Sequence, residues 1–389
     1  MPKCYMDIRA PVTLDAALRT AEIDMAKLVG GARFSLGLGD GSSMRQNTTL
    51  AAAYVWTNVD AVIDPLVAAA RPCIIILGTD FPKGAQIASD LGVSTWVEIN
   101  RPREAAWPYW CADHAALIAY VKAKYAAAGL NPADYVFIQM ANEPNKGGAG
   151  GPWNASGIGN YSAPYAAMAL GTYDRASDLT TDTGRNLHAQ LNYMATNLDK
   201  SGLLFLGPSI ETQASDFAVE LSTIGNGDWL SYVDIPAFNH YPLLTYNQTG
   251  THRAFVRAYY DSLMATKAAI IAAVPSWASK QFALTEFGAT MNMIRFGSGY
   301  PYSQFGHQRR WEYILALKDK LETCGEFAHI SAYCTRERIS VADGSLYGAI
   351  KDDGTYTYGW RPFARRSGVS TASPPSGSYA GASGEAVAS

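Results

Sequence analysis

Short apolar runs alternate with longer helical patterns along most of the chain, and this alternation is the feature that most restricts the possible folds. Eight such runs begin at Cys4, Ala32, Cys73, Tyr135, Leu203, Val233, Gln281 and His329. Continuous apolar runs are typical of strands that are buried on both faces of a parallel sheet. Because eight strands alternating with helices over about 360 residues indicate a barrel, we predict an α/β protein with a single-domain (β/α)8 TIM-barrel fold.

The helical patterns support this order of elements. Five clear patterns cover residues 14–31, 113–130, 185–202, 254–274 and 307–325, and two fainter ones are expected within 50–70 and 213–232. The second pattern begins at Asp113 and ends at Gly129, which are typical cap residues. An open, doubly wound sheet is the alternative. A dinucleotide-binding sheet of that class carries GxGxxG after its first strand, whereas the stretch GLGDGSSM follows the second strand and lacks that spacing.

Two segments fall outside the alternation. Residues 147–173, after the fourth run, are rich in Gly, Ala and Tyr, and we predict a long loop on the face of the barrel that carries active sites. Residues 367–389 are rich in Ser, Ala and Gly, and we predict a disordered tail or linker there. The expected organisation is a catalytic barrel over residues 1–366 followed by this tail.

Charge and hydropathy disfavour several kinds of partner. The net charge is -3 and no block of basic residues occurs, so neither nucleic acid nor an anionic membrane is expected to bind. No apolar stretch approaches the roughly 20 residues of a membrane-spanning helix. The first residues, MPKCYMDIRAP, lack the apolar core of a secretory leader. Cytoplasmic, phage- or particle-associated, and secreted locations with the leader removed all stay open, as does the oligomeric state.

The cysteines and histidines show no metal-binding spacing. The five cysteines, Cys4, Cys73, Cys111, Cys324 and Cys334, are scattered and form no CxxC pair. The six histidines form no HxxxH or HExxH pair. A zinc site or a disulfide framework is therefore not expected. We predict mostly buried free thiols, no metal and no organic cofactor.

Two glutamates end predicted strands. Glu143 ends the fourth run in FIQMANEPN, and Glu286 ends the seventh in FALTEFGAT. In a barrel both side chains would point across the mouth, where the chemistry takes place. Two carboxyl groups on either side of a sugar bond are the machinery of glycoside hydrolysis, provided that their environments separate their pKa values. The simpler alternative for Glu143 is a place at a helix N-terminus, between a capping Asn and a Pro.

Three motifs in order carry a family resemblance. NEP from Asn142 ends the fourth strand, NHY from Asn239 the sixth, and TEFG from Thr285 the seventh. The chain thereby resembles clan A glycoside hydrolases, and within them the cellulase- and mannanase-like family 5, which are retaining β-glycosidases. The resemblance implies that Glu143 is the acid/base and Glu286 the nucleophile. It also implies that Asn142 binds the sugar 2-hydroxyl.

Further positions fit the same family. The resemblance implies that Arg33, on the second strand, donates a hydrogen bond near the nucleophile. It implies the same for Tyr241, which we expect to donate its hydroxyl to Glu286. By strand alternation Asn239 lies on the same face as Tyr241; His240 is a further candidate for substrate binding. The simpler alternatives are an ordinary ion pair for Arg33 and core packing for the residues of the sixth strand.

The sequence also departs from family 5. The third strand ends at Gly78 where the family has a histidine, and no Trp follows the eighth strand, where Tyr333 stands instead. We assign Tyr333 to substrate binding, together with Trp110 of the WPYW stretch, which we place in the loop after the third strand. Aromatic rings of this kind can stack on sugar faces, although a single Trp more often belongs to the core.

The sequence therefore predicts a retaining hydrolase of β-glycosidic bonds, with a polysaccharide or oligosaccharide as its partner. The sugar, the linkage and endo or exo action are not indicated. The alternative is a degraded or non-catalytic barrel that binds glycans, as phage-tail and cell-surface proteins do. The distance between the Glu143 and Glu286 carboxyl groups separates the classes: about 5–5.5 Å for a retaining enzyme, roughly 6.5–9.5 Å for an inverting one.

Overall fold

The structure is a computed structural model of the chain. It describes residues 2–8, 16–36, 54–77, 107–140, 142, 193–207, 209, 228–242, 244, 251–289, 304–333, 350 and 361–367. The predicted loop over 147–173 and all but the first residue of the predicted tail lie outside these ranges, as do Glu143 and Cys334.

Eight strands form one sheet, as the eight apolar runs predict. They are β1 (Lys3–Ile8), β2 (Ala32–Leu36), β3 (Cys73–Leu77), β4 (Val136–Gln139), β5 (Phe205–Leu206), β6 (Ala237–His240), β7 (Phe282–Phe287) and β8 (Phe327–Ala332). Their order in the sheet is β5-β4-β3-β2-β1-β8-β7-β6, and a parallel bridge joins Leu206 to Ile235, just before β6. Neighbours in the sheet are thus neighbours in the chain, which is the topology of a (β/α)8 barrel. The predicted fold class is confirmed.

The helices lie between the strands in sequence. They are α1 (Ala16–Val29), α2 (Thr57–Ala68), α5 (Trp107–Ala127), α6 (Pro132–Tyr135), α11 (Asp228–Tyr232), α13 (His252–Ala273), the 3-10 helix η3 (Pro275–Trp277), α14 (Gln304–Thr323) and α15 (Arg361–Ser367). Of the helix expected over 185–202, the structure describes residues 193–202; residues 193–197 are helical and 198–202 are not.

Two helices differ from the sequence analysis. Helix α5 begins at Trp107, so the WPYW stretch forms its first turn and is not a loop, and Asp113 is not the N-cap. A Pro is tolerated in the first turn, where its missing N–H has no helical partner, so Pro108 does not end the helix. The short helix α6 was not predicted, although the Asn131 side chain caps it by accepting from the Ala133 amide and Pro132 follows directly.

The chain divides into two compact units. The first comprises Met1–Phe34, His240–Met264 and Leu284–Ser389, and the second comprises Ser35–Asn239 and Ala265–Ala283. Strands β2, β6 and β7 and helix α13 contribute residues to both units.

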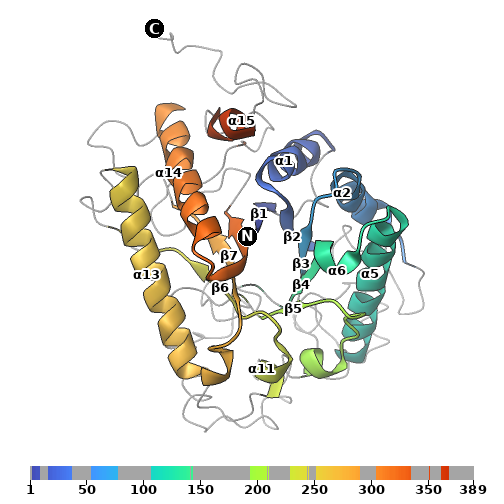
Figure 1. The fold of residues 1–389 in the computed structure, drawn as a ribbon. Helices are drawn as coiled ribbons and strands as arrows, with labels where there is room; N and C mark the ends of the chain where they lie inside the picture. The colour runs from blue at the N-terminus through green and yellow to red at the C-terminus, as the bar shows by residue number, and fades with distance from the viewer. Residues whose placement is uncertain are drawn as a thin grey trace, which may run out of the picture. The chain divides into compact units, whose positions relative to one another are not determined.

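In the first unit, β1 pairs with β2 on one side and with β8 on the other. Helix α1 packs on β1, helix α14 packs on β8, and α15 lies against both helices (Figure 1). Strand β1 alternates: Tyr5 and Asp7 point to one face, and Cys4, Met6 and Ile8 to the other. The Tyr5 hydroxyl lies 2.9 Å from Nδ1 of His329 on β8, and both side chains are buried.

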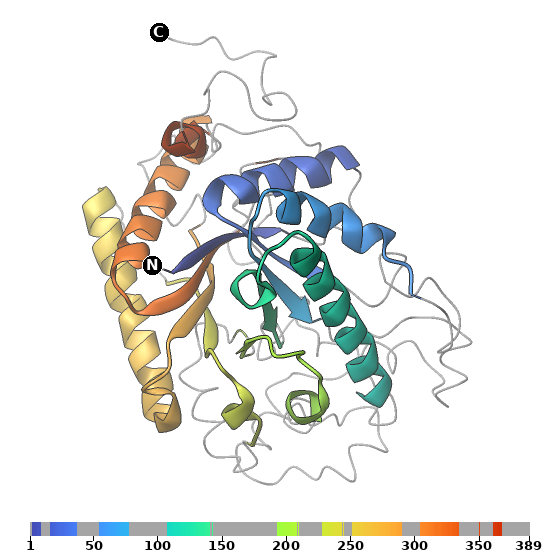
Figure 2. The same ribbon diagram turned by 45° about the vertical axis from the view of Figure 1, so that its right-hand side comes forward.

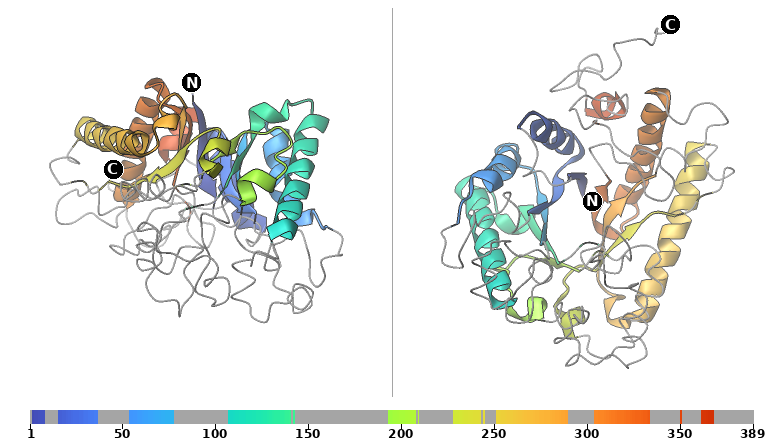
Figure 3. Two further views of the ribbon diagram at one scale, coloured as in Figure 1. Left: turned by 90° about the horizontal axis from the view of Figure 1, so that it is seen from below. Right: turned by 180° about the vertical axis from the view of Figure 1, so that it is seen from behind.

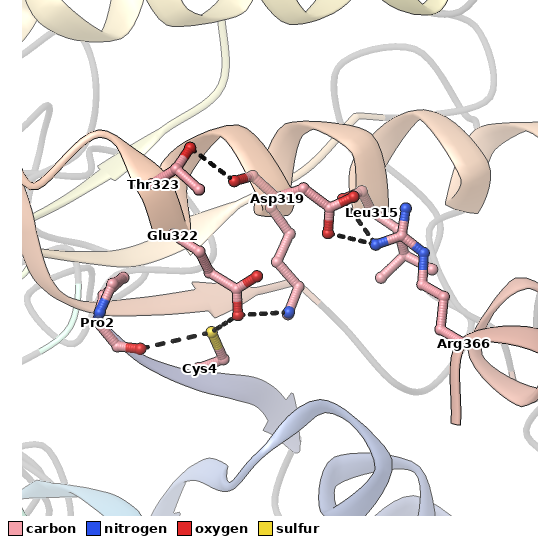
Figure 4. Close-up of polar contacts among 8 residues, drawn as sticks. Pro2, Cys4, Leu315, Asp319, Glu322, Thr323 and Arg366 are labelled. Atoms are coloured by element: carbon pink, nitrogen blue, oxygen red, sulfur yellow. Dashed lines mark hydrogen bonds and ion pairs between the residues drawn. The ribbon is translucent and has the colours of Figure 1, made fainter. Parts of the chain in front are cut away.

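The opposite face of β1 meets helix α14 through a polar cluster (Figure 4). The Cys4 thiol donates to Oε1 of Glu322 at 2.8 Å, and Lys318 donates to the same oxygen at 2.7 Å. Arg366 of α15 contacts Asp319 of α14. Burial raises the pKa of the Cys4 thiol to about 12. Cys4, Cys73 and Cys111 are buried free thiols, as predicted.

In the second unit, β3, β4 and β5 are parallel neighbours, and α2 and α5 lie side by side (Figures 2 and 3). Trp56, just before α2, stacks on Tyr120 of α5 with ring centroids 4.1 Å apart. Lys124 of α5 forms ion pairs of 2.8 and 2.9 Å with Asp60 and Asp64 of α2. These contacts fix α2 on α5. No helix within the described ranges is long and apolar enough to cross a membrane.

Candidate active site

Glu286 is a buried carboxylate at the end of β7. Its residue is 5% exposed, within a strand whose other members are also buried. A buried charge is costly unless it is paired and hydrogen-bonded. Arg33 Nη1 donates to Oε1 at 2.8 Å, and the Tyr241 hydroxyl donates to Oε2 at 2.8 Å. Each carboxylate oxygen therefore has a donor, and this pairing stabilises the ionised form.

Arg33 lies on β2 and is fully buried. The same Nη1 that binds Glu286 also contacts Oδ2 of Asp7 on β1. Burial alone would lower the pKa of the Arg33 guanidinium, but the charges of Asp7 and then Glu286 raise it above its ordinary value. Arg33 is therefore a permanent cation held between two carboxylates. Its contact with Glu286 is the one that the family resemblance implies.

Asp7 is a member of this group that the sequence analysis missed. It stands directly opposite Arg33 in the parallel register of β1 and β2, so both side chains point to the same face. The signal in the sequence is a single carboxylate inside the apolar run CYMDI. A charge in such a position is rarely tolerated without a partner, and this rule would have marked Asp7 for attention.

Tyr241 follows the last residue of β6 and is half-buried. Its ring meets the ring of Tyr333 edge to face, with centroids 5.9 Å apart and an interplanar angle of 83°. Tyr333 follows β8, and its amide donates to the Phe287 carbonyl of β7 at 2.9 Å. Two of the predicted substrate-binding tyrosines are thus neighbours, and Tyr241 reaches Glu286 as expected.

Tyr259 of α13 forms hydrogen bonds with the last residue of β6 and with Gly288, which follows β7. Its hydroxyl donates to the His240 carbonyl and accepts a hydrogen bond from the Gly288 amide at 3.1 Å. The His240 ring packs edge to face on Tyr259 with centroids 5.4 Å apart, and burial lowers the pKa of His240 to about 3. His240 thus contacts Tyr259 through its carbonyl and its ring, and its role in substrate binding stays a prediction.

Gly288 follows Phe287 and allows a close approach of two strands. A Cβ built on Gly288 would lie 3.0 Å from the Tyr333 carbonyl oxygen and 3.7 Å from Cε1 of Tyr241. The absence of a side chain therefore lets the backbone beyond β8 and the Tyr241 ring come near Glu286.

The second unit holds two more of the predicted residues. Asn142 forms a parallel bridge with Ser209 beyond the end of β4. The Asn239 side-chain amide donates to Oδ1 of Asn142 at 3.3 Å, and Asn239 is fully buried. This hydrogen bond orients the Asn142 side chain. Glu143 lies outside the described residues, as does the side chain of Trp110, whose backbone belongs to the first turn of α5.

Solved structures of glycoside hydrolases have the same fold as this chain. A monomeric β-xylosidase from Caulobacter crescentus CB15 matches with a TM-score of 0.53 and 16% identity, over 93% of this chain and 67% of that chain. A GH5_18 protein from Streptomyces cattleya, solved with GlcNAc, matches with a TM-score of 0.52 and 15% identity, over 94% and 80%. A GH39 β-xylosidase from Caulobacter crescentus matches with a TM-score of 0.50 and 16% identity, over 93% of this chain and 70% of that chain. The chain has the fold of the clan A glycoside hydrolases.

The similarity to these hydrolases is one of fold, because the identities are low. No protein-family model and no curated protein sequence matches the chain. Within the described residues, no group of three or more His, Cys, Asp or Glu side chains could hold a metal ion.

Proposed function

We propose that the protein is a retaining glycoside hydrolase that cleaves β-glycosidic bonds in an oligosaccharide or polysaccharide. One observation carries the proposal: Glu286 is buried at the end of β7 with Arg33 on one oxygen and Tyr241 on the other. This pairing favours the ionised form of a buried carboxylate, and a nucleophile for an anomeric carbon needs this state. The glycosidase fold supports the same conclusion.

In the first step of this mechanism, one Glu286 oxygen attacks the anomeric carbon. The bond from that carbon to the leaving oxygen breaks, and Glu143 gives its proton to the leaving oxygen. The product is a glycosyl ester on Glu286. The Tyr241 hydroxyl and the Arg33 guanidinium hold the carboxylate in place, so the attacking oxygen needs no reorganisation at the moment of reaction.

In the second step, water takes the place of the leaving group. Glu143, now ionised, takes a proton from the water as the water oxygen attacks the anomeric carbon. The ester bond breaks and Glu286 returns as a carboxylate. In this proposal Asn142, oriented by Asn239, donates to the sugar 2-hydroxyl through both steps. Tyr333 and Tyr241 offer aromatic surface for the sugar ring.

Two of the structural neighbours are named as β-xylosidases, and the third was solved with GlcNAc. The first substrates to test are therefore aryl β-xylosides, β-glucosides, β-mannosides and N-acetyl-β-glucosaminides, followed by β-glucans, mannans, xylans and bacterial exopolysaccharides. We expect wild type to release product from at least one member of this panel. The Glu286→Gln variant is expected to lose at least about a thousandfold in kcat, because a neutral amide cannot form the ester.

The matched control is Glu322→Gln, which removes a carboxylate at the Cys4 end of β1, in the cluster of Figure 4. This control is expected to retain wild-type turnover. Equal turnover by wild type and Glu286→Gln would contradict the proposal. Glycan binding by both proteins without any hydrolysis would instead favour the alternative, a barrel that only binds glycans.

A further inference from the structure

Asp7 is the second carboxylate on the guanidinium that holds Glu286. It is 6% exposed, and its register partner Arg33 is fully buried. Two ion pairs of Arg33 involve the same nitrogen, Nη1: one with Asp7 Oδ2 and one with Glu286 Oε1 at 2.8 Å. The two carboxylates therefore share one donor atom. Together, the three groups carry a net charge of minus one rather than the zero of a simple ion pair.

This shared cation affects the reactivity of Glu286. The first step of the proposed mechanism removes negative charge from Glu286 as the ester forms. A guanidinium devoted to Glu286 alone would stabilise the carboxylate before attack more than after it, and so would slow that step. Asp7 offsets this effect, because it neutralises part of the Arg33 charge and adds a like charge near Glu286.

Among the described residues, Asp7 is a second carboxylate that contacts the guanidinium bound to Glu286. Around Glu286 and its donors, the structure shows Asp7 from β1, Arg33 from β2, Tyr241 from the end of β6 and Tyr333 from the end of β8. The two tyrosines contribute hydroxyl groups and rings that are neutral at working pH. Within this group, Asp7 is the carboxylate that balances Arg33 against Glu286.

We propose that Asp7 is a positioning residue that keeps Glu286 nucleophilic by sharing the Arg33 guanidinium with it. This inference rests on the proposed function, because it assigns Asp7 a role in the attack by Glu286. It is distinct from a purely structural role, in which Asp7 would only hold Arg33 in place. The two roles predict shifts of opposite sign in one measurement.

The measurement is the pH profile of kcat/KM for Asp7→Asn, with a dinitrophenyl glycoside of the sugar that wild type accepts. Such a leaving group needs no proton, so the acidic limb of the profile reports ionisation of the nucleophile in the free enzyme. The asparagine keeps the size of Asp7 and an oxygen for Arg33. We expect the acidic limb to move lower by about one pH unit, and kcat/KM on the plateau to fall about tenfold.

A purely structural role would give the opposite shift. If Asp7 only holds Arg33, its replacement releases Arg33 from Glu286, and the acidic limb then moves to higher pH. An unchanged or higher limb in Asp7→Asn would overturn the proposal. Asp7→Glu retains the charge, so its acidic limb is expected to stay near that of wild type. If Asp7→Glu shifts the limb as far as Asp7→Asn does, the proposal is also overturned. Glu322→Gln, at the other end of β1, is the matched control and is expected to match wild type.

A second readout does not depend on a substrate. Carbon-13 labelling of glutamate carboxyl groups allows the titration of Glu286 to be followed by NMR, with its signal identified by its loss in Glu286→Gln. A lower midpoint in Asp7→Asn supports the coupling, and an unchanged or higher one overturns it, whatever the activity. Asp7→Asn could lower the titration midpoint of Glu286 while wild type hydrolyses nothing on the panel. That result would confirm the coupling between Asp7 and Glu286 and reject the proposed hydrolase. If Asp7→Asn does not fold, Asp7→Ser gives the same comparison.

Discussion

Glu286 shows how far single residues could be predicted. Its place at a strand end and the TEFG motif pointed to it, and Arg33 and Tyr241 followed from the family resemblance. The structure places both donors on its oxygens. Asp7 was not predicted, because the contact depends on the register of β1 and β2, which brings it opposite Arg33. Pairing between strands cannot be obtained from the local pattern of either strand.

Buried histidines give a prediction on stability. Burial lowers the pKa of His329 to about 3, with the Lys3 charge acting in the same direction, and burial lowers that of His240 to about 3. The unfolded chain takes up these protons near pH 6.5, whereas the folded protein does not. The contribution of these two neutral histidines to the free energy of unfolding is thus fully present above about pH 6.5, and it is lost as the pH falls toward 3. Each histidine contributes about 1.4 kcal/mol per pH unit in that window.

The test is urea unfolding between pH 7 and pH 4 for wild type and His329→Gln. We expect the free energy of unfolding to fall less steeply with decreasing pH in the variant, by about 1.4 kcal/mol per pH unit. His252→Gln, at the exposed start of α13, is the control and is expected to keep nearly the wild-type slope. Equal slopes for wild type and His329→Gln would show that His329 is not buried neutral.

The strands were more predictable than the helices. Each of the eight apolar runs overlaps a strand, because burial on both faces leaves a clear pattern. The start of α5 was missed because the aromatic residues and the Pro of WPYW were interpreted as a loop. A Pro in the first turn is compatible with a helix. β5 has only two residues, so most of its predicted run lies outside the strand.

The approach of β7 to the chain beyond β8 gives a prediction for Gly288→Ala. The added Cβ would meet the Tyr333 carbonyl at 3.0 Å, and a backbone atom cannot move without shifting Tyr333 and Tyr241. We expect a loss of about 1–3 kcal/mol in unfolding free energy and a lower kcat. Gly207→Ala is the control: its Cβ would meet a side-chain atom, Val233 Cγ1, at 3.2 Å. A smaller cost is expected there, and equal costs would contradict this account.

At the scale of the whole molecule, topology follows from the order of the elements. Strands that are consecutive in sequence are neighbours in the sheet, and a parallel bridge joins Leu206 of β5 to Ile235, just before β6. The parallel sheet was predictable because each βα unit has its own pattern. The substrate was not, because a fold hosts many activities and specificity depends on particular side chains at the strand ends.

The most direct test of the central claim is to trap the glycosyl ester. Wild type is incubated with an activated aryl glycoside in which fluorine replaces the sugar 2-hydroxyl, which slows the second step more than the first. Peptide mass spectrometry is then used to locate the sugar. The account predicts one added sugar on the peptide that contains Glu286, and none in Glu286→Gln. The analogue is made from a substrate that wild type turns over. If it labels another residue, or labels none, the assignment of Glu286 as the nucleophile is contradicted.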